Sequence, residues 1–200
     1  SALRMRDLTG KGQFIDLALL DVQMSSLANI SSAYLNTGFE SSRLGNKHNN
    51  VAPYQVFECE DGPLMFCVGT EDQFRKFCEM VNRREWISDE RFKTNTLRKQ
   101  NERALTAYIS QVTLTKTRDE WIELLQHYKI PGGRVNTVAE AFQQPQVIAR
   151  NLIGEMDHPV YGTVKFVKNP LQYSELNISY DSSPPLLGEH TEEILKMNKN

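Results

Sequence analysis

Two β-hairpins that lie far apart in the sequence constrain the fold most strongly. The first joins strand-like residues 54–59 and 63–68 across an Asp-Gly pair, which is typical of a tight hairpin turn. The second joins residues 153–157 and 163–167 across the sequence His-Pro-Val-Tyr-Gly. Helical patterns precede, separate and follow the hairpins, so the strands do not alternate with helices as in a βαβ series. The sequence therefore predicts an α+β fold built of hairpins, antiparallel strands and helices.

Periodicity and capping signals predict the other elements. The first hairpin ends at Gly69, and Thr70 can cap a helix that runs through residue 81. The remaining expectations are a helix of roughly 17 residues within 88–114, capping boxes at 117–120 and 137–140, a short strand at 134–135, a helical turn opened by Pro145 and a terminal helix at 189–197.

The segment 14–35 is apolar on much of a helical circumference. Apolar side chains recur there with helical spacing, and further ones occupy flanking positions, as at Leu17 and Met24. We expect one long helix that ends at Gly38 and whose apolar surface needs a partner. Polar segments near 38–50 and 178–188 then suggest a small domain that is connected at both ends to something else.

Composition excludes several classes of function. Lys and Arg number 23 against 25 Asp and Glu, a formal net charge of −2, whereas a dedicated nucleic-acid binder is normally basic. No apolar run approaches the ~18 residues of a membrane span. The histidines are not paired at metal-ligand spacing, so no metal site is expected. Three cysteines without a CxxC pair favour a reducing compartment: the cytoplasm or, in a eukaryote, the mitochondrial matrix.

The residues alone leave two interpretations of the turn at 69–72. A strand end followed by a helix start exposes backbone N–H groups and suits an anionic ligand. A tight turn with a helix cap explains the same residues. His48, in an Asn-rich segment, could likewise donate to a ligand or have a structural role. Glu58, Glu60 and Asp61 are more typical of a solvated turn than of an acid/base pair.

Several ordered strings resemble the family III CoA-transferases. They are TGKGQFIDLALLD at 9–21, Asn46 and His48 followed by Pro53-Tyr54, the DG and VGTEDQF pair within 61–74, RFKTN with Arg98 and NER within 91–103, and PPLLGEHT at 184–191. Together with shorter strings they span nearly all of the 200 residues. Within the family, the chain looks most similar to members that use dicarboxylic acyl groups, such as succinyl-CoA.

The resemblance implies a covalent reaction. Family members move CoA from an acyl-CoA to a carboxylate acceptor, and an aspartate attacks the thioester to give a mixed anhydride and then an aspartyl-CoA thioester. The CoA thioester is a substrate, and no permanently bound cofactor is implied. Members form interlocked homodimers, in which a Rossmann-like α/β large domain is built from both ends of each chain.

Domain and site assignments follow from the same resemblance. Residues 1–40 are expected to give a helix of the large domain, 41–140 the small α+β domain, and 141–200 a return linker, hairpin and C-terminal helix toward the large domain. Backbone N–H groups of the loop formed by Gly69, Thr70 and Glu71 would stabilise oxyanions and exclude water. Leu19 and His48 are expected near the ligand.

The expected nucleophile is not identified in this chain. In the family the catalytic aspartate lies upstream of the TGKGQ string, and neither Asp7, Asp16 nor Asp21 matches its motif. We therefore expect a C-terminal half that needs the N-terminal half of the same enzyme and is inactive alone. The alternatives are part of an α-methylacyl-CoA racemase-like enzyme, and a non-catalytic assembly module whose helix at 14–35 is an oligomer surface.

Overall fold

A three-stranded antiparallel sheet forms one layer of the central unit, which we define as residues 44–135. The computed structural model describes residues 1–197. The strands are β1 (Tyr54–Cys59), β2 (Gly62–Cys67) and β3 (Gly132–Arg134), in the order β1-β2-β3. The hairpin predicted at 54–68 is confirmed by the pairing of β1 with β2. The strand predicted at 134–135 is observed slightly earlier, as β3, because Met65 on β2 pairs with Gly133.

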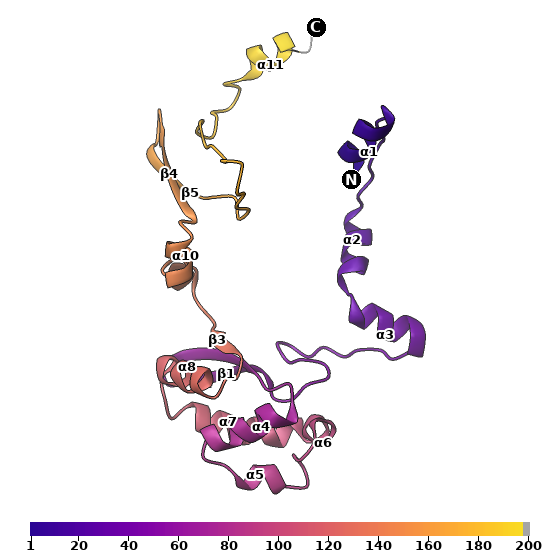
Figure 1. Ribbon diagram of the computed structural model, residues 1–200, viewed down its shortest axis with the longest axis vertical. Helices are drawn as coiled ribbons and strands as arrows, with labels where there is room; N and C mark the ends of the chain where they lie inside the picture. The colour runs from indigo at the N-terminus through magenta and orange to yellow at the C-terminus, as the bar shows by residue number, and fades with distance from the viewer. Residues whose placement is uncertain (198–200) are drawn as a thin grey trace.

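Five helices form the rest of the central unit and lie mostly below the sheet in Figure 1. They are α4 (Glu71–Met80), α5 (Glu85–Ser88), α6 (Asn95–Gln100), α7 (Glu102–Thr113) and α8 (Arg118–His127). The capping box predicted at Thr117 is confirmed, since its hydroxyl accepts from the backbone N–H of Glu120. This cap fixes where α8 begins, and the helix then buries Trp121 and Leu125 in the core.

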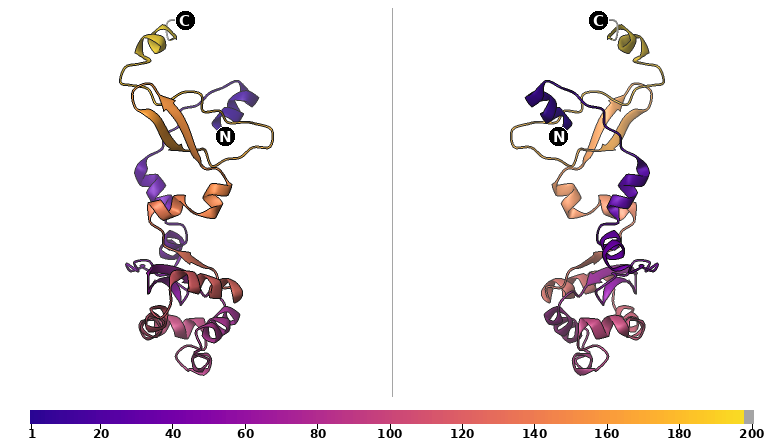
Figure 2. Two further views of the ribbon diagram at one scale, coloured as in Figure 1. Left: turned by 90° about the vertical axis from the view of Figure 1, so that its left-hand side faces the viewer. Right: turned by 90° about the vertical axis from the view of Figure 1, so that its right-hand side faces the viewer.

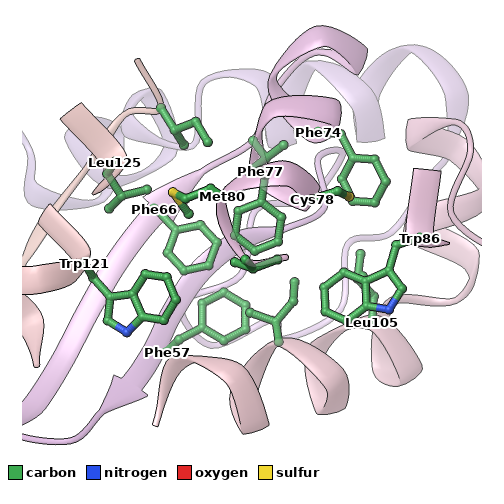
Figure 3. Packing of buried hydrophobic residues seen from close by; sticks show 14 of the residues in the cluster. Phe57, Phe66, Phe74, Phe77, Cys78, Met80, Trp86, Leu105, Trp121 and Leu125 are labelled. Carbon is green, nitrogen blue, oxygen red and sulfur yellow. The ribbon is translucent and has the colours of Figure 1, made fainter. Parts of the chain in front are cut away.

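The core lies between the sheet and these helices (Figure 3). Alternate residues of the strands point into it, so Phe57 and Phe66 stack on each other with ring centroids 4.7 Å apart. Phe77 of α4 continues the stack at 5.2 Å from Phe66. Trp121 of α8 is buried, and its indole N–H donates to the carbonyl oxygen of Thr113 at 2.8 Å. The central unit therefore has a hydrophobic core of its own.

Two arms extend from the same end of the central unit and carry the two chain ends (Figures 1 and 2). The N-terminal arm, residues 1–43, holds α1 (Ala2–Thr9), α2 (Leu19–Ser26) and α3 (Asn29–Thr37). The C-terminal arm, residues 136–197, holds α9 (Val138–Phe142), α10 (Pro145–Ala149), β4 (Ile153–His158), β5 (Gly162–Val167) and α11 (Thr191–Met197). The predicted second hairpin is confirmed as β4 paired with β5.

The arms leave large apolar side chains uncovered. Helices α1, α2, α3 and α11 have no buried residue. Phe14 is 92% exposed and Leu187 is fully exposed. An isolated two-stranded hairpin such as β4–β5 is only marginally stable in water. The arms therefore expose apolar surface that no other described part of the chain covers.

The prediction of one long helix over 14–35 is wrong. The chain is extended before Leu19, and the helical part is divided into α2 and α3 at Ala28, whose φ is +48°. Ser25 and Ser26 end α2, and the Ser26 hydroxyl donates to the carbonyl oxygen of Gln23 at 2.8 Å. Serine side chains compete for backbone groups in this way, and no packed face is present to stabilise a longer helix. Gly38 ends α3 as predicted.

The helix of roughly 17 residues expected within 88–114 is also interrupted. Asn101 separates α6 from α7, and its side-chain amide donates to the carbonyl oxygen of Leu97 at 2.9 Å. The capping box at Thr137 and the helix start at Pro145 are confirmed. Among helices of residues 1–197, none combines the length and the hydropathy that a membrane crossing requires.

Candidate functional site

The turn between β2 and α4 is held by a reciprocal cap. The Thr70 hydroxyl accepts from the backbone N–H of Gln73 at 3.2 Å, which confirms Thr70 as the helix cap. In return, Oε1 of Gln73 accepts from the backbone N–H groups of Gly69 and Thr70 at 2.7 and 3.1 Å. Two of the three backbone N–H groups expected to face an oxyanion, those of Gly69 and Thr70, are therefore occupied by a side chain in this conformation. A rotation of Gln73 would make both available.

Glu71, the third residue of the expected loop, is anchored through its side chain. Its Oε2 accepts from Nη1 of Arg98 at 2.7 Å, and its Oε1 accepts from the backbone N–H of Asn95 at 2.9 Å. Partial burial raises the pKa of Glu71, but the hydrogen bonds from Arg98 and Asn95 outweigh burial and hold the pKa below its ordinary value. Glu71 is thus an ionised acceptor at neutral pH rather than a proton donor.

His48 is fixed at the entry to the central unit. Its ring stacks on Tyr54, with centroids 4.9 Å apart and planes at 8°. Its Nδ1 accepts from the backbone N–H of Asn50 at 3.0 Å, so the neutral imidazole carries its proton on Nε2. The backbone N–H of His48 donates to the carbonyl oxygen of Tyr54 at 2.9 Å. The ring face, Nδ1 and backbone N–H of His48 thus have structural contacts, and Nε2 is the ring atom left to donate to a ligand.

Helix α6 connects His48 to the turn, a link that no local sequence pattern predicted. Lys99 donates from Nζ to the carbonyl oxygen of His48 at 3.0 Å. Asn95 donates from Nδ2 to the carbonyl oxygen of Asn50 at 2.7 Å. The string RFKTN with Arg98 was the available signal, although it carried no assigned role. The structure thus brings two of the three expected ligand-proximal segments to one short helix.

An apolar hollow of about 270 Å³ lies against the sheet beside the turn. Its lining includes Tyr54, Met65, Cys67, Pro131 and Val135. Cys67 sits at the end of β2, and its Sγ lies 3.9 Å from the position of a Cβ on Gly69. Burial raises the pKa of the Cys67 thiol. The hollow can take an apolar chain next to Gly69, and Cys67 lines it as a neutral thiol.

Leu19 is not brought to this site. It lies on α2 in the N-terminal arm and is 91% exposed. Helix α2 lies apart from α4, the helix that follows the turn, in Figure 1. Asp7, Asp16 and Asp21 lie in the same arm. Within residues 1–197, no group of three or more His, Cys, Asp or Glu side chains is placed to hold a metal ion.

Comparisons with known proteins agree with one another. The sequence model of CoA-transferase family III matches residues 1–191. The chain is 36% identical over 196 residues to a mouse succinyl-CoA:glutarate CoA-transferase, and the alignment covers 98% of this chain and 45% of that protein. It is 35% identical over 187 residues to a succinate–glutarate CoA-transferase of Agrobacterium fabrum, covering 94% and 47% of the two chains.

A solved structure is also similar to this chain over nearly its whole length. The crystal structure of a CAIB/BAIF family protein from Brucella suis superposes with a TM-score of 0.79 at 38% identity, over 98% of this chain and 50% of that one. The chain therefore spans about half the length of the curated relatives that it matches.

Proposed function

The chain belongs to CoA-transferase family III, and on that premise we propose that it is the C-terminal half of an enzyme that moves CoA from an acyl-CoA to a carboxylic acid. The observation that carries this proposal is the match of almost the whole chain to transferases whose names pair succinyl-CoA or succinate with glutarate. Succinyl-CoA is accordingly the proposed donor, and a dicarboxylate is the proposed acceptor.

The proposed reaction proceeds through an aspartate of the N-terminal half. Its carboxylate adds to the thioester carbonyl and expels CoA thiolate, which gives a mixed anhydride. The thiolate then attacks the aspartyl carbonyl, so the donor leaves as a carboxylate and an aspartyl-CoA thioester forms. The acceptor carboxylate reverses these steps, which transfers CoA to the acceptor and restores the aspartate.

Four features of this chain would have roles in that reaction. The turn at Gly69 and Thr70 would cover the thioester, and its N–H groups would stabilise the oxyanion once Gln73 rotates away. The hollow beside Gly69 offers an apolar surface to the carbon chain of the acyl group. Nε2 of His48 would donate to the ligand, and Leu19 would contact the thiol arm of CoA after the N-terminal arm is packed.

The uncovered arms support the proposed assembly. Family members form interlocked homodimers with a Rossmann-like large domain, and the apolar helices α2 and α3 would belong to that domain. Cys59, Cys67 and Cys78 are free thiols within residues 1–197, which fits a reducing compartment such as the cytoplasm or a mitochondrial matrix.

The proposed function is tested by assaying the chain alone and after co-purification with an N-terminal half encoded upstream of residue 1. We expect no transfer from succinyl-CoA to glutarate by the chain alone, and transfer after the halves are combined. A hydroxylamine-sensitive acyl-enzyme on the chain alone would contradict the assignment of the nucleophile. Exchange of the α-hydrogen without CoA transfer would instead indicate a racemase-like enzyme, and an oligomer that ignores CoA would indicate an assembly module.

A further inference from the structure

Arg98 is a fully buried cation that joins several segments of the central unit. Its Nε donates to the carbonyl oxygen of Ala52 at 2.9 Å, and its Nη1 donates to the carbonyl oxygen of Phe92 at 3.0 Å. The guanidinium carbon lies 4.2 Å from the ring centroid of Phe74. Burying such a charge is unfavourable unless it is paired, and the carboxylate that pairs with it is Glu71.

Placing an arginine at this core position costs free energy, because its charged group is removed from water. Nη2 of Arg98 is buried and has no hydrogen-bond partner among residues 1–197. Only the arginine end of the ion pair is buried, because the Glu71 side chain is 58% exposed, so Arg98 loses its hydration while its partner remains partly in water. Stability alone therefore explains the incompletely hydrogen-bonded guanidinium of Arg98 poorly. Its contacts point instead to a role in fixing the relative positions of the segments that it joins.

That geometry links the turn to the segment at 48–52. The Glu71 carboxylate is held by Arg98 and by the backbone N–H of Asn95. The Asn95 side chain in turn accepts from the backbone N–H of Ala52 at 3.2 Å and donates to the carbonyl oxygen of Asn50. Two residues one helical turn apart on α6 thus bind the turn on one side and the entering chain on the other.

We propose that Arg98 acts through Glu71 as a positioning residue for CoA transfer, holding the Gly69–Thr70–Glu71 turn and the 48–52 segment in one fixed relation. The inference rests on the proposed function. Glu71 takes no proton in the reaction. Its ion pair sets where the turn stands above the reacting thioester and keeps water from the aspartyl-CoA intermediate.

The kinetic test uses full-length enzyme and the variant Glu71→Gln. The Glu71 side chain is 58% exposed, so the neutral amide is accommodated without a new cavity. The matched control is Asp72→Asn, because Asp72 is the next residue and pairs with the surface residues Arg75 and Lys76. Misplacing a positioned group costs up to about 100-fold in rate. We expect Glu71→Gln to lower kcat by about 10- to 100-fold, with little change in KM.

Two further readouts separate positioning from other roles. The ratio of hydrolysis to transfer should rise in Glu71→Gln and stay unchanged in Asp72→Asn, because only the first variant loosens the turn. The pH profile of kcat should keep its shape. Loss of one limb of that profile would show that Glu71 exchanges a proton and would overturn the proposal. Wild-type kcat together with a wild-type hydrolysis ratio in Glu71→Gln would also overturn it.

Hydrogen exchange distinguishes this inference from the proposed function. In Glu71→Gln, backbone amides at 69–72 and at 48–52 should both exchange faster, whereas Asp72→Asn should leave the 48–52 amides unchanged. Faster exchange at 69–72 alone would overturn the coupling, whether or not the enzyme transfers CoA. Absence of CoA transfer by wild-type enzyme would overturn the proposed function, and the exchange result would still decide whether the pair couples the two segments.

Discussion

At the scale of the residue, Gln73 shows how one side chain can serve both fold and site. Its amide oxygen satisfies two backbone donors that the helix start would otherwise leave without a partner. The same donors are those that the proposed reaction needs. A ligand oxyanion would therefore replace the Gln73 oxygen rather than find an empty place, and binding is an exchange of acceptors.

Asp61 provides a test of stability at the same scale. The backbone N–H of Arg118 donates to Oδ1 of Asp61 at 2.7 Å, and this hydrogen bond holds the pKa of Asp61 below the ordinary 3.8. The folded chain then binds fewer protons than the unfolded chain, so the stabilisation is complete above pH 3.8 and is lost as the pH falls below it.

We expect Asp61→Asn to weaken the dependence of stability on acid pH. Urea unfolding can be followed by the fluorescence of Trp86 and Trp121, which both lie in the central unit. The midpoint for wild type should fall as the pH is lowered through this range, and the midpoint for Asp61→Asn should fall less. Identical pH profiles for the two proteins would contradict the account.

At the scale of the element, β3 can approach β2 and α8 because of Gly132. A Cβ at this position would lie 2.7 Å from Cδ1 of Leu125 and 2.9 Å from the carbonyl oxygen of Met65. A Cβ on the neighbouring Gly133 would meet no heavy atom within 4 Å. The close packing of this short strand therefore depends on one glycine and not on its neighbour.

The substitution Gly132→Ala should destabilise the central unit by about 1–3 kcal/mol, the usual cost of overpacking a core. Gly133→Ala is the matched control and should change stability by much less. Tryptophan fluorescence during urea unfolding measures both. An effect of Gly132→Ala as small as that of Gly133→Ala would show that β3 shifts far enough to accept a methyl group.

Local signals predicted some elements well and failed for others, for physical reasons. The hairpin turns and the caps at Thr70, Thr117 and Thr137 involve residues three or four apart, so the sequence holds their signals. The break at Ala28 was not predicted, because the apolar periodicity of 14–35 continues through it while serine side chains just before it compete for backbone groups. The position of the candidate turn was predictable, but its anchor was not, because Arg98 reaches partners 27 and 46 residues away.

At the scale of the whole molecule, the contrast between the central unit and the arms is the main feature. The central unit buries its Phe and Trp side chains, whereas the arms leave Phe14 and Phe39 exposed. Segments with few buried contacts open easily and exchange their amide hydrogens quickly. The arms should accordingly be the part of the chain that changes most on assembly.

We expect amides of α1, α2 and α3 to exchange rapidly in the chain alone and slowly after the N-terminal half is bound. Amides of β1, β2 and α7 should be protected in both states, because they belong to the core of the central unit. Mass spectrometry of peptic peptides measures this difference. Protection of the N-terminal arm in the isolated, monomeric chain would contradict the expectation.

The central unit is joined to the rest of the chain by two polypeptide connections, one before β1 and one after β3 (Figure 1). A rigid body attached at two points keeps one easy motion, rotation about the line through those points. The turn at Gly69 lies on the central unit, so a rotation of the unit about that line would carry the turn along a single arc. Substrate binding at the turn would therefore depend on the angle through which the central unit is rotated. A substitution at either connection would change that angle without altering any residue of the turn.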